Sequence, residues 1–98
     1  MENQPQENDM TTAINDEAVL AIGESFDELT GEKRTHFLKT LKADPDRVRA
    51  FLSTNLEELT LKACMQTNTV CVVTNREEAT QELMHYLLKL FATELAAV

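Results

Sequence analysis

Residues 75–95 are NREEATQELMHYLLKLFATEL, which is the strongest helical pattern in this chain. Asn75 and Glu78 have the spacing of a capping box, and the acids at this end suit the positive pole of a helix dipole. Projected around a helix, the apolar side chains cover about 200°, against the roughly 100° that a surface helix needs to cover one core. We therefore expect a helix that is either central to the domain or shared between the core and a partner. Its apolar residues are Ala79, Leu83, Met84, Tyr86, Leu87, Leu88, Leu90, Phe91 and Leu95.

The first helix of the chain is predicted to begin near Thr12, with Asn15 or Thr12 as its cap. Apolar residues recur there at i, i+3 and i+4 spacing, which is the pattern of an amphipathic helix. Gly31 is a suitable stop, because glycine accepts the left-handed conformation that follows many helices. The apolar stripe consists of Ala18, Val19, Ile22, Phe26 and Leu29.

Three more helices are predicted between this stripe and the last helix, over residues 32–43, 45–53 and 55–66. In the second of these, Asp44 is the expected cap and Pro45 occupies the first helical position, where its missing N–H costs nothing. Asn55 is the expected cap of the third. The side chains that we expect to be buried are Phe37, Leu38 and Leu41, then Val48, Phe51 and Leu52, then Leu56, Leu59 and Ala63.

Residues 67–74, TNTVCVVT, have a β-branched, apolar centre that is typical of a strand. No second strand is visible elsewhere in the sequence, so a strand here would have to pair with something, for example the same strand of another copy. The alternatives are a buried extended connection or a continuation of the preceding helix.

Together these patterns predict an all-α fold. The expected architecture is a compact bundle of four to five helices over residues 12–98, behind a disordered acidic tail at 1–11, with one short extended segment possible at 68–74. Ninety-eight residues with 43% hydrophobic content are enough for one modest core and too few for two. Trp is absent and Gly and Pro occur twice each, which suits helices.

The charge is distributed unevenly along the chain. Residues 1–31 contain eight acids and no Lys or Arg, so the formal net charge of −8 belongs to the first third. This acidity argues against a general affinity for nucleic acids or for anionic membranes. Residues 33–49 are the exception, with six basic residues against two acids. Arg34 lies in the first turn of its helix, where the dipole disfavours a cation, so this segment either contacts an acidic partner or attracts the chain's own acidic first helix.

No catalytic, cofactor or metal-binding motif is recognisable. His36 and His85 fall on the polar sides of their helices, and Cys64 and Cys71 lack the spacing of a zinc or redox pair. We expect two reduced cysteines in a cytoplasmic protein, with neither a secretory signal nor a membrane span. The sequence therefore predicts a protein that is not an enzyme and needs no cofactor.

Apolar residues exceed what a bundle of this size can bury on its inner faces. Leu61 and Met65 form an i, i+4 pair opposite the buried side of their helix, and the last helix has its wide apolar arc. We therefore expect a partner surface, and a homodimer in particular. The predicted partner-binding residues are Leu61, Met65, Leu83, Leu87, Leu88, Phe91 and Leu95, with the acids Asp16, Glu24 and Asp27.

The functional hypothesis is a small acidic regulator or adaptor that binds another protein with a basic or apolar surface. Apolar docking would supply the affinity, and the acids of residues 1–31 would steer the encounter. One alternative is an inhibitor, of the kind that phages or mobile elements encode, whose carboxylates imitate a phosphate backbone. Another is a small transcriptional regulator that uses the basic 33–49 segment, although direct binding to nucleic acid is disfavoured by the charge.

Overall fold

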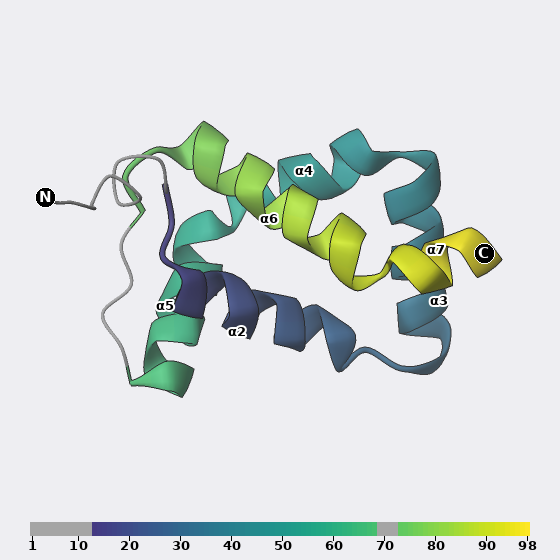
Figure 1. Ribbon diagram of the computed structural model, residues 1–98, viewed down its shortest axis with the longest axis horizontal. Coiled ribbons are helices and arrows are strands. Elements are labelled where there is room, and N and C mark those ends of the chain that lie inside the picture. The colour runs from purple at the N-terminus through teal and green to yellow at the C-terminus, as the bar shows by residue number, and fades with distance from the viewer. Residues whose placement is uncertain (1–12, 69–72) are drawn as a thin grey trace, which may run out of the picture.

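The computed structural model describes residues 13–68 and 73–98, and the predicted disordered tail lies outside these ranges. The described residues form α-helices and no strand, which confirms the all-α prediction (Figure 1). No helix in the described part of the chain is long and apolar enough to cross a membrane. The helices are α2 (Asp16–Asp27), α3 (Gly31–Ala43), α4 (Pro45–Thr54), α5 (Leu56–Thr67), α6 (Arg76–Leu90) and α7 (Ala92–Ala97).

Two of the predicted helix starts are confirmed, and Asn15, Asp44 and Asn55 occupy the predicted N-cap positions, although none of the three makes a side-chain cap hydrogen bond. The side chain of Asn75 accepts a hydrogen bond from the backbone N–H of Glu78 at 3.0 Å, and α4 begins at Pro45. Asp44 makes no side-chain cap hydrogen bond. Asn55 makes none to α5 either, and its Nδ2 donates to the Phe51 carbonyl of α4 at 2.9 Å. Asn55 therefore satisfies the end of one helix instead of the start of the next.

The turn between α2 and α3 differs from the prediction. Helix α2 ends at Asp27, before the last residue of its predicted stripe, Leu29. Gly31 does adopt a left-handed φ of 60°, but it is the first residue of α3 and not the residue that ends α2. The glycine is thus used to enter a helix, in a conformation that a β-carbon would disfavour.

The segment after α5 is extended where it is described. Val73 forms an isolated antiparallel bridge with Ile14, and the N–H of Thr74 donates to the Ala13 carbonyl at 2.9 Å. The N–H of Ala13 in turn donates to Glu82 Oε2 of α6 at 2.9 Å. Val73 and Thr74 therefore pair within their own chain, with the residues that lead into α2. Residues 69–72, which include Cys71, lie outside the described residues.

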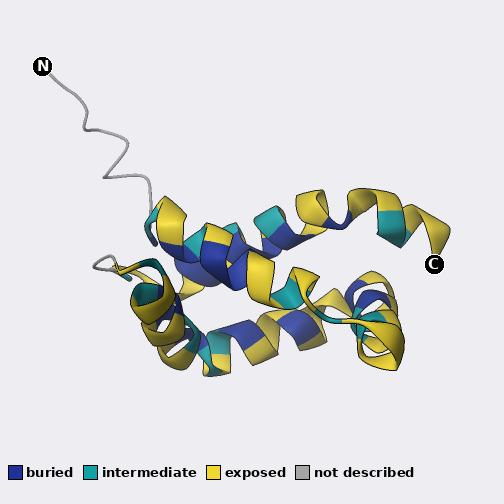
Figure 2. Cartoon of the chain, turned by 90° about the horizontal axis from the view of Figure 1, so that it is seen from below, coloured by how far each residue is buried: buried dark blue, intermediate teal, exposed yellow. Residues whose placement is uncertain are grey.

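The core lies between α2 and α6, which both start near this bridge and run toward the other end of the molecule (Figure 1). Helix α5 crosses beside α2 at one end, α3 lies at the other end, and α4 runs back alongside α6. Figure 2 shows the buried residues on the sides of the helices that face one another. The largest fully buried side chains are Ile14, Ile22, Leu41, Leu52, Leu56, Leu83, Leu87 and Phe91. The last long helix is thus central to the fold.

The helix predicted over 75–95 is interrupted at Phe91, which has φ −102° and ψ 16° between α6 and α7. Phe91 is buried against the ring of Phe37, with ring centroids 5.4 Å apart. The break turns α7 toward α3, so that Glu94 reaches Arg34 and the Val98 carbonyl accepts a hydrogen bond from Lys42 at 2.6 Å. Tertiary contacts therefore override a sequence pattern that would favour one continuous helix.

Candidate functional site

All four phenylalanines of the chain belong to one row of ring contacts. Phe26 of α2 stacks on Phe37 of α3 with centroids 4.9 Å apart, and it meets Phe51 of α4 edge to face at 6.5 Å. Phe37 continues the row to Phe91, also edge to face. Stacked and edge-to-face arrangements are those that the quadrupoles of aromatic rings favour. The row runs from a buried ring, Phe91, to an exposed one, Phe51.

Phe51 stands at the mouth of an apolar groove of about 360 Å³. It is 51% exposed, so the prediction that it is buried was wrong. The reason lies in the helical spacing: α4 turns Val48 and Leu52 into the core, and Phe51 falls at the edge of that stripe. We refer to this hollow as the phenylalanine groove. It is lined by Phe26, His36, Phe37, Thr40, Arg47, Val48 and Phe51.

Arg47 is the one formally charged side chain among the described residues that line this groove. It precedes Phe51 by four residues on α4, so the two side chains lie on the same face of that helix. Arg47 forms no ion pair within the described ranges, whereas Arg34 and Arg76 do. The groove therefore combines an apolar wall with a guanidinium group whose charge is not matched by a described carboxylate.

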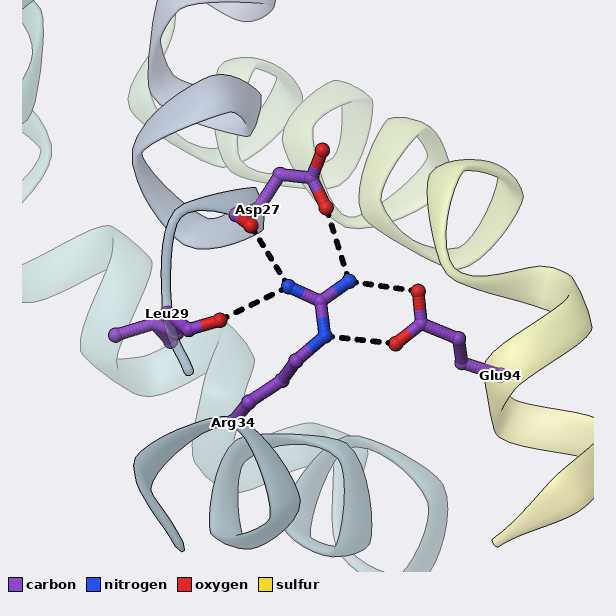
Figure 3. Close-up of polar contacts among 4 residues, drawn as sticks. All are labelled: Asp27, Leu29, Arg34 and Glu94. Atoms are coloured by element: carbon purple, nitrogen blue, oxygen red, sulfur yellow. Dashed lines mark hydrogen bonds and ion pairs between the residues drawn. The ribbon is translucent and has the colours of Figure 1, made fainter. Parts of the chain in front are cut away.

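Arg34 of α3 is bound by three segments of the chain (Figure 3). Its Nε and Nη2 donate to the two carboxylate oxygens of Glu94 at 2.8 and 2.6 Å. The second Nη2 hydrogen bond goes to Asp27 Oδ1 at 2.9 Å, and Nη1 donates to the carbonyls of Asp27 and Leu29 at 2.7 and 3.0 Å. These contacts occupy all five N–H donors of a guanidinium. Arg34 thus joins the end of α2 and the turn after it to α7.

The same guanidinium lies over the ring of Phe91, 5.2 Å from its centroid. Because Phe91 contacts Phe37, and Phe37 lines the groove, Arg34 supports the aromatic row from its buried end. The sequence had left open whether the basic segment contacts a partner or the chain's own acids. For Arg34 the structure shows the second, since Asp27 belongs to the acidic first helix.

The Arg34 network also shifts the titration of its members. Hydrogen bonds from Arg34 lower the pKa of Glu94 below its ordinary value of 4.5, with a smaller opposing effect of desolvation. Hydrogen bonds to Glu94 and Asp27 raise the pKa of Arg34 further above its ordinary value. Each group therefore favours the charged form of the other.

No protein-family model, no curated protein and no solved structure matches this chain.

The predicted apolar partner-binding residues divide into a buried and an exposed group. Leu83, Leu87 and Phe91 have at most 1% of their surface exposed, so they form the core and are not available for docking. Leu83 and Leu87 are covered because α2 and α4 pack on α6, and Phe91 is covered because it packs on Phe37 of α3. Leu95 is half-buried against the core, and the exposed residues are Leu61, Met65 and Leu88.

Leu61 and Met65 are 62% and 75% exposed on the outer side of α5. This α5 face lies at the opposite end of the molecule from α3, one of the helices that form the phenylalanine groove (Figure 1). The two exposed apolar surfaces are therefore separate.

The predicted acidic residues Asp16, Glu24 and Asp27 are all exposed on α2. Asp27 differs from the other two because it is held by Arg34 through both its carboxylate and its carbonyl. Its charge is thus offset inside the molecule, which leaves Asp16 and Glu24 as the carboxylates of this set that face solvent without an ion pair within the described ranges.

His36 and His85 are exposed, as expected, and His36 contributes to the rim of the phenylalanine groove. Cys64 is half-buried on α5, and Cys71 lies outside the described residues. Residues 13–68 and 73–98 contain no group of three His, Cys, Asp or Glu side chains that could hold a metal ion. The phenylalanine groove is the feature that sequence reasoning missed, although Arg47, Val48 and Phe51 already share one side of a predicted helix.

Proposed function

We propose that this chain is a small regulatory or adaptor protein that receives an apolar segment of another protein in the phenylalanine groove. The observation that carries the proposal is the exposure of Phe51 at the mouth of a hollow whose walls are the rings of Phe26 and Phe37. Aromatic side chains that are partly open to water in a concave site are the usual anchors of protein interfaces.

The energetics favour a ligand that covers Phe51. Burying a phenylalanine completely stabilises by about 1.5–3 kcal/mol, and half of this ring is still in water. Covering the rest would contribute roughly 1 kcal/mol from Phe51 alone, before the apolar surface of the ligand is counted. The neighbouring rings are already fixed by stacking, so a ligand meets a preformed surface and little ordering cost opposes binding.

The dimensions suit a short segment better than a flat protein surface. A volume of about 360 Å³ lies at the lower end of the range for ligand sites, enough for one or two apolar side chains. Such a groove between helices receives an amphipathic helix that presents anchors at i, i+3 and i+4. The separate α5 face, with the exposed Leu61 and Met65, would leave the chain free to pair with a second copy of itself at the same time.

The experiment is a selection of random 16-residue peptides, displayed on phage, against the immobilised full chain. Enriched peptides are then synthesised, and their Kd values are measured for the wild type, Phe51→Ala and Leu61→Ala. Phe51→Ala removes the ring at the groove mouth, and Leu61→Ala is the matched control because it truncates another exposed apolar residue, on α5 and away from the groove. We expect the enriched peptides to carry apolar anchors. Their Kd should rise about tenfold or more for Phe51→Ala and should not change for Leu61→Ala.

The proposal is wrong if no enriched peptide depends on Phe51, or if Phe51→Ala and Leu61→Ala weaken binding equally. Circular dichroism of both variants ensures that a loss of binding is not a loss of fold.

A further inference from the structure

We infer that the segment bound by the phenylalanine groove is acidic beside its anchor: it carries a carboxylate within one helical turn of the apolar side chain, and that carboxylate binds Arg47. This inference rests on the function proposed above and specifies the chemistry of the partner.

The position of Arg47 supports the inference. Arg47 and Phe51 are separated by one turn of α4 and line the same hollow. A ligand side chain that packs on Phe51 therefore brings its neighbours one turn away to the guanidinium. An arginine offers a planar fork of donors that matches the two oxygens of a carboxylate, so such a contact fixes orientation as well as affinity.

The other arginine pairs of this chain show what Arg47 lacks. Arg34 is bound by Asp27 and Glu94, and Arg76 of α6 donates to Glu57 Oε2 at 2.9 Å and to the Ser53 carbonyl. Arg47 has no described carboxylate partner, although Asp44 and Asp46 are close in sequence. Its donors are therefore open to a carboxylate from outside, at the edge of an apolar wall that lowers the local dielectric and strengthens the pair.

The charge of the whole chain limits how acidic the ligand can be. With a net charge of −8, the protein as a whole disfavours a strongly acidic partner. At physiological salt this repulsion is screened over about 8 Å, so contacts at the groove decide the outcome. We therefore expect one or two carboxylates beside the anchor and neutral or basic residues elsewhere in the ligand.

The test uses the selected peptides that depend on Phe51. Their Kd values are measured for the wild type, Arg47→Gln and Arg49→Gln, and again after each peptide carboxylate is replaced by its amide. Arg49 is the matched control, because it lies on the same helix but lines a different hollow, with Asp46, Ser53 and Glu77. We expect Arg47→Gln to weaken binding by about 10- to 100-fold, as loss of a charged hydrogen-bonded pair should, and Arg49→Gln by less than about twofold.

A double-mutant cycle completes the test. The peptide with its key carboxylate changed to an amide should lose no further affinity with Arg47→Gln, because the partner of Arg47 is already gone. If the peptides need Phe51 but bind the wild type and Arg47→Gln with equal Kd, the inference that the ligand carries a carboxylate for Arg47 is wrong. The proposed function is not affected by that result. If no peptide needs Phe51, both proposals fail. A self-association of the chain that Phe51→Ala abolishes would make a second copy the occupant and overturn this inference.

Discussion

Gly23 of α2 and Tyr86 of α6 lie in direct contact, because the Tyr86 ring occupies the space that a β-carbon at position 23 would take. Gly23 is buried, and two carbons of the ring would overlap or closely approach such a β-carbon. The absence of a side chain at this one position lets the two central helices approach each other.

Gly23→Ala is expected to destabilise the protein, although glycine is a poor helix former. In an exposed helix the change would stabilise by up to about 1 kcal/mol. Here the overlap with Tyr86 costs about 1–3 kcal/mol and outweighs that gain. Urea unfolding should show a lower free energy of unfolding for Gly23→Ala. In a Tyr86→Ala background, where the ring is gone, the same change should become neutral or stabilising; an equal loss in both backgrounds would contradict the packing argument.

Leu87 and Leu88 are neighbours that should respond very differently to truncation. Leu87 is completely buried and Leu88 is 41% exposed. Leu87→Ala leaves a cavity in the core and should cost about 2–5 kcal/mol, whereas Leu88→Ala should cost less than about 1 kcal/mol. Denaturant midpoints of the two variants provide the measurement, and comparable losses would mean that α6 is rotated relative to the core described above.

The Glu94–Arg34 pair should make stability depend on pH. Because hydrogen bonds from Arg34 hold the pKa of Glu94 below 4.5 in the folded state, the pair stabilises above pH 4.5 and its contribution is lost as the pH falls through the folded pKa. Glu94→Gln should therefore lower Tm at pH 7, and its deficit against the wild type should shrink in acid. Glu24→Gln changes an exposed carboxylate of α2 that forms no ion pair within the described ranges, so it should show no such deficit; a Glu94→Gln deficit that is constant with pH would refute the effect.

The α5 face is the surface on which we expect a homodimer, since Leu61 and Met65 are the most exposed large apolar side chains described. Light-scattering mass over a concentration series should give a dimer at low and at high salt, because apolar contacts are not screened. Changing Leu61 and Met65 together to Glu should give a monomer with unchanged helix content. Leu20→Glu on α2 is the control, and a monomeric wild type at every concentration would exclude this dimer.

Much of the fold could be predicted because local signals and tertiary packing agree. The capping pair at Asn75 and the proline at position 45 place two helix starts without any knowledge of packing. The break at Phe91 could not be predicted, since nothing in its neighbours disfavours a helix and its cause is a contact with Phe37, far away in the sequence. The pairing of Val73 with Ile14 could not be predicted either, because a single bridge is too short to produce a periodic pattern in the sequence.

The site was harder to foresee than the fold. Helical periodicity indicates which residues can face inward, but it does not say how many of them the neighbouring helices cover. It thus misplaced Phe51 in the core, and Leu83 and Leu87 on a docking surface, because α6 was covered more fully than α4. Arg34 joins α3 to α7 through Glu94, and Glu94 reaches it only because the chain turns after α6.

The phenylalanine groove has a practical optical consequence. The chain contains no tryptophan, and its single tyrosine, Tyr86, packs on Gly23 of α2 and does not line the groove. Rings of phenylalanine absorb and emit weakly, so the side chains that line the groove contribute almost no fluorescence. A ligand that carries one tryptophan can therefore be excited selectively, and the shift of its emission to shorter wavelength would report directly on the entry of its own indole into the apolar hollow.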